Sequence, residues 1–237
     1  MAMPAPLFTH LDGRFPIYAH DHVAVLYRGE REGYRLTSFL AEGLKRGDLC
    51  QYLAPGEMHP GMLASIRALQ VNPDPFLHSE MLRLSTGAPG FTELCDRTQK
   101  TFDDAERAKV PALRWLEEGS WGESAGFPAE KFFEFHALLN YQVKHYPSVA
   151  LCQYSLDRLD PDFLFPAIAT HRHLLIGNTL VRDNPFYIPA EKFIPLSPVD
   201  RQRSLVDLFR EVGFDVEKLL AAISDYGRIH PGAADSI

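Results

Sequence analysis

Short apolar runs that alternate with amphipathic helices constrain the fold of this chain more than any other feature. The first run, His22-Val-Ala-Val-Leu-Tyr27, is rich in valine, which indicates a buried strand. Apolar residues at helical spacing follow over 34–46. The same alternation predicts further strands and helices at 48–53, 57–69, 81–84, 90–109, 112–116, 128–145, 149–154, 160–170 and 173–177. Strands separated by helices pair in parallel, so the sequence predicts an α/β domain whose mostly parallel sheet has helices on both faces.

Both ends of the chain differ from this central part. Residues 1–21 contain three prolines and no periodic pattern, which predicts an irregular N-terminal arm. We expect one α/β domain over 22–188, followed by a linker and a C-terminal helical hairpin over 189–237. Ser197 and Asp215 stand at positions that cap helices, and each helix carries an apolar stripe. This apolar face packs on the domain itself, on a second copy in a homodimer, or on a signalling protein.

The composition excludes several classes of function. The chain has 31 acidic and 24 basic residues and a net charge of −7, so we expect no direct contact with nucleic acid. The longest uncharged apolar run, 163–170, is far shorter than the roughly 20 residues that cross a bilayer, so we expect no membrane contact. An odd and sparse set of cysteines, Cys50, Cys95 and Cys152, argues against a secreted disulfide framework and favours the cytoplasm.

The loop after the first strand lacks the pattern that binds phosphates. Ligands of doubly wound folds bind at the carboxyl ends of the strands, where a nucleotide-binding loop needs two glycines five residues apart followed by Lys and Ser or Thr. The loop here is Arg28-Gly-Glu-Arg-Glu-Gly33, whose two carboxylates repel phosphate. The strand ending in Glu117-Glu118 also lacks the expected aspartate, and we expect these two glutamates at a solvated strand end that leads into a polar turn over 117–122. ATP hydrolysis is therefore disfavoured, and a nucleotide-binding module using Arg31, Arg35 and Glu118 remains the alternative.

Polar side chains interrupt strands that should be buried on both faces. His22 opens the first strand, Arg114 lies within the fourth, and the second strand's Leu49-Cys-Gln-Tyr52 recurs in the fifth as Leu151-Cys-Gln-Tyr154. A buried polar group costs free energy unless it is partnered. These groups therefore either satisfy one another or line a small-ligand pocket, with Trp121 among the aromatic residues of its wall.

Two other kinds of site have no supporting motif. Cys50, Cys152 and His22 lie on different predicted strands, and with His171 and His173 they would form a soft-ligand metal site. No metal-ligand spacing occurs in the sequence, so we predict no metal and identify no cofactor. A catalytic cysteine paired with His136 or His171 likewise lacks any sign of an activated thiol. We predict that the protein is not an enzyme.

Seven short motifs resemble, in their order, those of the MEDS domain, a sensory domain of methanogens and methylotrophs related to a dichloromethane-responsive repressor. The resemblance covers about residues 20–188. The motifs are His22…Tyr27, Gly47-Asp-Leu-Cys-Gln-Tyr52, Leu113-Arg114…Glu118…Trp121, Glu134…Leu139-Asn140, Leu151-Cys-Gln-Tyr154, His171 and Asn184-Pro-Phe-Tyr187.

This resemblance implies a fold like RecA and KaiC without a functional phosphate loop. It also implies a non-catalytic sensor that binds a small organic ligand and signals to a kinase or a transcription factor. We expect the ligand at the carboxyl ends of the strands, beneath the loop 28–33 and the turn 117–122. A ligand-free interaction scaffold that acts through the hairpin after residue 197 is a further alternative. The positions that match the family, with Trp121 added for the pocket wall, make the candidate ligand-binding residues His22, Tyr27, Cys50, Tyr52, Arg114, Glu118, Trp121, Glu134, Cys152, Tyr154 and His171.

Overall fold

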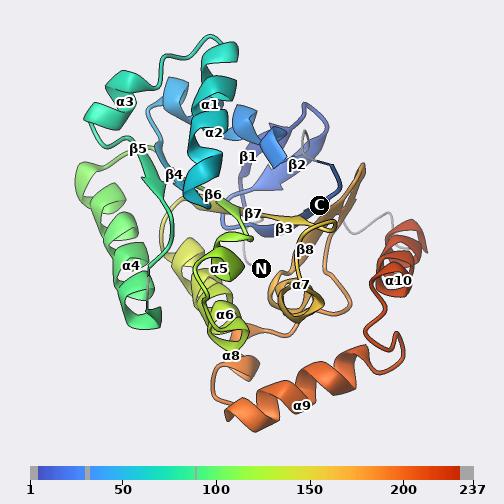
Figure 1. Ribbon diagram of the computed structural model, residues 1–237. Coiled ribbons are helices and arrows are strands. Elements are labelled where there is room, and N and C mark those ends of the chain that lie inside the picture. The colour runs from blue at the N-terminus through green and yellow to red at the C-terminus, as the bar shows by residue number, and fades with distance from the viewer. Residues whose placement is uncertain (1–4, 30–32, 89, 230–237) are drawn as a thin grey trace.

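A computed structural model describes residues 5–29, 33–88 and 90–229 and contains the predicted layered α/β arrangement (Figure 1). Within these residues a seven-stranded sheet is formed by β3 (His22–Tyr27), β4 (Leu49–Leu53), β5 (Leu82–Ser85), β6 (Leu113–Glu118), β7 (Ser148–Ser155), β8 (His173–Ile176) and β9 (Thr179–Val181). The strand order is β5-β4-β6-β7-β3-β8-β9. In this order, neighbouring strands from β5 to β8 pair in parallel, and β9 pairs with β8 in the antiparallel direction. The prediction of a mostly parallel sheet is confirmed.

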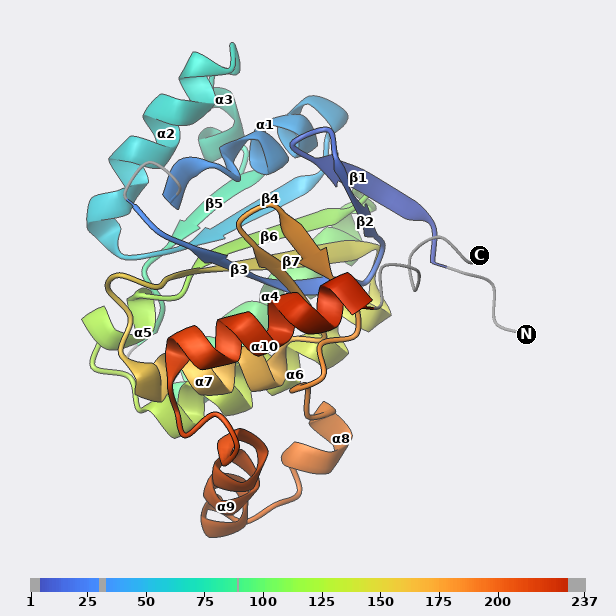
Figure 2. The same ribbon diagram turned by 90° about the vertical axis from the view of Figure 1, so that its right-hand side faces the viewer.

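Helices cover both faces of this sheet (Figure 2). One face is covered by α1 (Thr37–Arg46) and α2 (His59–Ala68), with the short turn η2 (Gly56–Met58) before α2 and α3 (Asp74–His78) after it. The other face is covered by α4 (Phe91–Ala108), α6 (Ala129–His145) and α7 (Pro161–Thr170), with the short α5 (Trp121–Ser124) beside them. Among the described residues, no helix combines the length and apolarity needed to cross a bilayer.

The N-terminal arm is more regular than the sequence predicts. β1 (Leu7–Leu11) and β2 (Phe15–Tyr18) form an antiparallel hairpin whose turn includes Gly13 at a positive φ. Ile17 is fully buried against the core beneath α1. The prediction of an irregular arm was therefore wrong for these residues. Each strand is too short to show a clear alternation, and Pro16 is tolerated because a two-stranded ribbon leaves backbone groups outside the ladder.

The end of β6 also differs from the sequence prediction. A polar turn was expected over 117–122, with Glu117 and Glu118 at a solvated strand end. Both side chains instead lie inside β6 and are buried, and α5 follows directly. The difference arises because their hydrogen-bond partners include residues far away in the chain, which sequence patterns do not reveal.

The C-terminal helices pack on the domain rather than standing free. They are α8 (Ala190–Phe193), α9 (Pro198–Phe209) and α10 (Val216–Ile229). Phe209 of α9 packs against Phe165 of α7 in a tilted arrangement with ring centroids 4.9 Å apart, and α10 lies beside β9 (Figure 2). Ser197 caps α9 as expected, because its Oγ accepts from the Asp200 backbone N–H at 3.2 Å. The buried stripes of α9 and α10 are thus covered by the chain itself.

Gly43 provides a test of the packing between α1 and the sheet. A Cβ added at this position would lie 2.7 Å from Arg114 Nε and 2.9 Å from Cys50 Sγ, both of which are buried. Helix propensity alone predicts that Gly43→Ala stabilises the protein by about 1 kcal/mol. We expect the opposite sign, a loss of about 1–3 kcal/mol, because the core is overpacked. Urea unfolding measures the difference.

The control is Gly90→Ala, where φ is −136° and an added Cβ meets nothing within 4 Å. This change should alter the free energy of unfolding by less than about 1 kcal/mol. A stabilised Gly43→Ala variant would contradict the packing described for Arg114.

Candidate functional site

The predicted site residues separate by the face of the sheet on which they lie. Neighbouring residues of a strand point to opposite faces. Tyr154 and Cys152 lie with His22, His171 and Trp121 on the face covered by α6 and α7. The opposite face, covered by α1 and α2, holds Tyr27, Cys50, Tyr52, Arg114 and Glu118. The structure therefore brings these residues into separate groups rather than one pocket.

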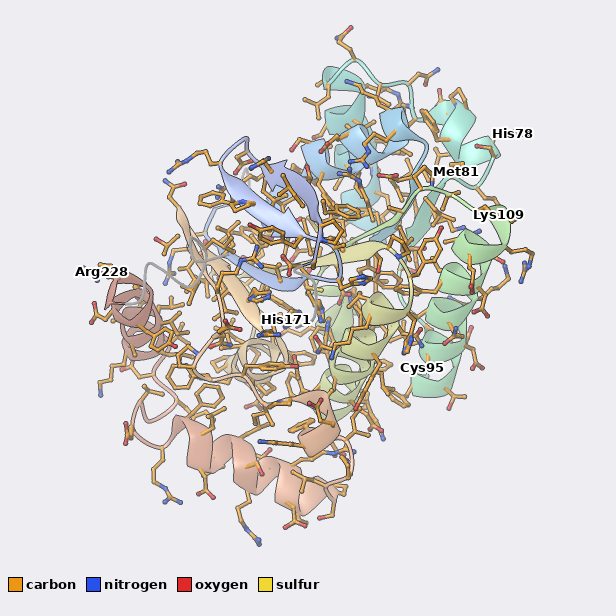
Figure 3. The ribbon with its side chains drawn as sticks, turned by 180° about the vertical axis from the view of Figure 1, so that it is seen from behind. His78, Met81, Cys95, Lys109, His171 and Arg228 are labelled. Atoms are coloured by element: carbon orange, nitrogen blue, oxygen red, sulfur yellow. The ribbon has the colours of Figure 1, made fainter. Side chains whose placement is uncertain are left out.

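Four buried side chains form a compact group that we name the histidine–cysteine cluster: His22, His136, Cys152 and His171. One nitrogen or sulfur atom from each lies within 4.8 Å of the others. The members come from β3, α6, β7 and the residue that ends α7. Figure 3 shows His171 in the interior of the molecule, away from Cys95 on α4.

The orientation of His22 follows from the hydrogen bonds of Asn140. The Asn140 amide nitrogen donates to two backbone carbonyls, of His136 at 3.1 Å and of Thr170 at 2.9 Å. Its Oδ1 is therefore the acceptor that faces His22 Nδ1 at 3.1 Å, so Nδ1 carries the proton. The lone pair of His22 Nε2 then points toward Cys152 Sγ, 3.3 Å away.

His171 is oriented in the same way. Its Nδ1 lies 2.6 Å from the Ala167 carbonyl oxygen, which only accepts, so Nδ1 donates. The other nitrogen, Nε2, is buried and has no hydrogen-bond partner. A buried polar atom left unpaired costs about 1–3 kcal/mol, so this nitrogen marks a position where a ligand would be stabilised.

His136 is held by a carboxylate. Its Nε2 lies 3.1 Å from Glu117 Oε1 and 3.3 Å from the Tyr154 hydroxyl. Glu117 also accepts from both indoles, Trp121 at 2.7 Å and Trp115 at 3.0 Å. His136 Nε2 therefore donates to the carboxylate, and Nδ1 faces Cys152 Sγ at 3.9 Å. Trp121, predicted as pocket wall, positions this carboxylate.

The surroundings keep His22, His171 and Cys152 uncharged at neutral pH. Burial lowers the pKa of His22 to about 3, and the neighbouring His136 adds to this effect. Burial holds the pKa of His171 well below its usual range, and the neighbouring His22 and His136 add to this effect. Burial and the Glu117 carboxylate raise the pKa of Cys152 well above its usual range. A thiol held in this form is a poor nucleophile, which disfavours a catalytic cysteine.

A second group, the carboxyl-edge cluster, consists of Tyr27, Tyr52 and Glu118 at the ends of β3, β4 and β6. The Tyr27 hydroxyl donates to Glu118 Oε2 at 2.8 Å, and the buried Tyr52 hydroxyl has no partner. Burial raises the pKa of Glu118 to about 7, although hydrogen bonds from Tyr27 and Ser120 act in the opposite direction. A cavity of about 210 Å³ adjoins Tyr27 and is also lined by Tyr34 and Met58.

Arg114 and Cys50 belong to a third group beneath α1. Arg114 is fully buried and donates to Asp48 Oδ2 at 2.8 Å and to the Phe39 carbonyl at 2.9 Å. Its guanidinium also lies 3.2 Å from Glu42 and 4.8 Å from the Phe39 ring centroid. A buried charge requires such partners. These contacts hold α1 against β4 and β6.

Glu134 lies apart from all three groups. It accepts from Lys131 at 2.7 Å and from Arg201 at 3.1 Å. Because Arg201 belongs to α9, this ion pair joins α6 to the C-terminal helices.

Sequence analysis missed three residues of the histidine–cysteine cluster and its surroundings. His136 appeared only as the partner of a catalytic cysteine, Asn140 only as part of a motif, and Glu117 as a solvated residue. The four-residue spacing of His136 and Asn140 on one buried helix face was an available signal, since such residues lie side by side.

Two of the three residues proposed for nucleotide binding, Arg35 and Glu118, already have partners. Arg35 donates to Asp12 at 2.7 Å and to the Gly177 carbonyl at 3.0 Å, and Glu118 is bonded to Tyr27. Arg31 and the rest of 30–32 lie outside the described residues, which also leaves the expected closure of loop 28–33 undescribed. The described contacts give the nucleotide alternative no support.

The fold and its buried polar groups define a class: an α/β domain whose mostly parallel sheet is covered by helices on both faces and carries buried polar side chains. Residues 21–172 match the family model of the MEthanogen/methylotroph, DcmR Sensory domain, MEDS, and the chain belongs to this family. The match begins at β3 and ends at the start of β8, so the Asn184-Pro-Phe-Tyr187 motif lies beyond it. A comparison with curated proteins found no match. Membership in a sensory-domain family supports a sensor role.

The pKa of Glu118 predicts how stability depends on pH. Because its pKa is raised from 4.5 to about 7 on folding, the native state holds this proton over that range and the unfolded state does not. The contribution of Glu118 to stability is therefore present at low pH and is lost as the pH rises through about 7. Relative to Glu118→Gln, the wild type should lose on the order of 3 kcal/mol of stability between pH 4.5 and 8. Urea unfolding at a series of pH values measures this.

The exposed Glu130→Gln serves as a matched control and should show no such difference from the wild type. A wild-type curve parallel to that of Glu118→Gln across this range would show that Glu118 is not buried in the way described.

Proposed function

We propose that the protein is a non-catalytic cytoplasmic sensor that binds a small organic ligand at the carboxyl-edge cluster and passes this state to a kinase or a transcription factor. The family supports the sensor role. We place the ligand at this cluster because the buried hydroxyl of Tyr52 has no hydrogen-bond partner and lies beside the Tyr27–Glu118 hydrogen bond. In open parallel sheets, ligands bind outside the carboxyl ends of the strands, which is where this group lies.

The chemistry of this cluster favours a small ligand with one polar group. The Tyr52 hydroxyl, which interacts electrostatically with Glu118 and Tyr34, can donate or accept one hydrogen bond. The cavity itself is lined by Tyr27, Tyr34 and Met58, which supply aromatic and thioether surface, and by the charged residues Glu57, Asp157 and Arg158. The cavity of about 210 Å³ is smaller than the roughly 300–1,000 Å³ that drug-sized ligands fill. A compound of a few heavy atoms with a hydroxyl, carbonyl or amide group suits it.

A chain of ion pairs joins this cavity to the C-terminal helices. Asp157, which lines the cavity, accepts from the Gly29 backbone N–H at 2.7 Å and from Arg28 at 3.1 Å. Arg28 also pairs with Glu217 of α10. A ligand that displaces Gly29 or Asp157 would therefore act on α10. Val199 and Val206 of α9 are exposed and offer apolar surface to the partner that receives the signal.

Tyr52→Phe tests the ligand site without removing a native hydrogen bond. The variant deletes an unpartnered hydroxyl, so we expect its stability to equal or exceed that of the wild type. Small alcohols, amides and haloalkanes form the probe panel, and saturation-transfer NMR measures binding. A compound that binds the wild type through Tyr52 should bind the variant at least about tenfold more weakly.

Tyr141→Phe on α6, at the opposite face of the sheet, is the matched control and should bind as the wild type does. Equal binding by Tyr52→Phe and wild type for every active compound would contradict this location. A tightly bound compound that leaves the hydrogen-exchange rates of 117–122 unchanged would also contradict it. A ligand changes the balance between two conformations only if it binds one of them more tightly than the other.

A further inference from the structure

We propose that the histidine–cysteine cluster binds a divalent first-row transition-metal ion such as Zn²⁺, through His22 Nε2, His136 Nδ1, His171 Nε2 and Cys152 Sγ. One ligand atom from each of the four residues lies within 4.8 Å of the others. The proposal goes beyond the sensor function and does not depend on an organic ligand at the carboxyl edge. It also replaces the sequence prediction that the chain has no metal.

The hydrogen bonds around the cluster leave its lone pairs facing inward. His22 and His171 each donate their Nδ1 proton outward, to Asn140 and to the Ala167 carbonyl. His136 donates outward through Nε2 to Glu117. The lone pairs of His22 Nε2 and His136 Nδ1 thus face the Cys152 thiol, whose single proton also has the Glu117 carboxylate as an acceptor at 3.9 Å. A cation satisfies all four atoms at once, including the unpartnered His171 Nε2.

The outward partners are those that metal-binding histidines have. A ligating imidazole donates its second N–H to a carboxylate, an amide or a backbone carbonyl, and this contact fixes the ring and its tautomer. Each kind occurs here: Glu117 for His136, Asn140 for His22 and the Ala167 carbonyl for His171. Charge also balances, since a divalent ion is offset by the Cys152 thiolate and the Glu117 carboxylate. Binding releases the thiol proton to solvent.

The separations suit a four-coordinate ion after the cluster contracts, by up to about 1.4 Å for the widest pair of ligand atoms. With bonds of about 2.0–2.3 Å, the ligands of a tetrahedral site lie roughly 3.4 Å apart. His22 Nε2 already lies 3.3 Å from Cys152 Sγ, and His136 Nδ1 lies 3.9 Å from it. Imidazole and thiolate together select zinc, copper or iron rather than magnesium or calcium, which prefer oxygen ligands.

A cavity adjoins the cluster at the amino edge of the sheet. It has a volume of about 580 Å³ and is lined by His22 and Asn140, which also belong to the cluster and its surroundings. Its other charged lining residues are mixed, with carboxylates from Asp21, Asp183 and Glu191 and cations from Lys144 and Arg172. The cavity therefore lies directly beside one side of the cluster, at His22.

Cobalt titration of the chelator-treated full chain tests the proposal, because Co²⁺ occupies zinc sites and is coloured. We expect one Co²⁺ per chain, with a thiolate-to-cobalt charge-transfer band and the intense visible bands of tetrahedral coordination. Cys152→Ser should lose the charge-transfer band. Cys50→Ser is the matched control, since Cys50 is equally buried in the same sheet but faces α1, and it should keep the band.

His171→Ala provides a second variant in case Cys152→Ser does not fold, which circular dichroism of the metal-free chains decides. This variant should keep the charge-transfer band at saturating Co²⁺ but bind at least about 10–100-fold more weakly. Tyr52→Phe should bind Co²⁺ as the wild type does, so failure of the organic-ligand site is distinguishable from failure of the metal site. A wild type without the band, a band that persists in Cys152→Ser, or unchanged affinity in His171→Ala would overturn the proposal.

Discussion

Burial of the parallel sheet on both faces is the constraint on which the rest of the structure depends. Every residue of β4 and β7 is buried, so a polar side chain on these strands cannot reach solvent. Each must find a partner on a neighbouring strand or on the helix above it. The same holds for β6, where the hydrogen bond from Arg114 to the Phe39 carbonyl is one such solution and attaches α1 to the sheet. The position of each polar residue in the strands thus determines which helix it holds.

The two faces solve this problem differently. Beneath α1, the Arg114 guanidinium reaches a carboxylate, a carbonyl and an aromatic ring. Beneath α6 and α7, outward hydrogen bonds orient three histidines so that their acceptor nitrogens face Cys152. Both arrangements leave buried polar atoms unpaired, Arg114 Nη2 and Asp48 Oδ1 in the first and His171 Nε2 in the second, but the first already holds a cation, the guanidinium, whereas the second offers acceptor nitrogens and a thiol. We infer that the α6–α7 face is the one built to hold an ion.

The sequence predicted the strand–helix order well, because buried strands and amphipathic helices have distinct periods. It could not predict which face of the sheet each polar side chain points to. The repeated Leu-Cys-Gln-Tyr segment suggests one symmetrical pocket, yet Cys50 faces α1 and Cys152 faces α6. A repeat of four residues does not reveal how its strand sits relative to the helices. The role of Glu117 was equally hidden, since two of its partners, Trp121 and His136, lie outside its strand and depend on helix packing.

The account rests on the tautomers of the buried histidines, which long-range ¹H–¹⁵N NMR correlation of the metal-free protein at neutral pH measures directly. It predicts that His22 and His171 are neutral rings protonated at Nδ1, with the lone pair at Nε2, and that both Nε2 resonances move when one equivalent of Zn²⁺ is added. Rings protonated at Nε2, or imidazolium ions at both positions, would contradict it. The acceptor atoms would then not converge on Cys152, and the cluster would be a self-satisfied part of the core.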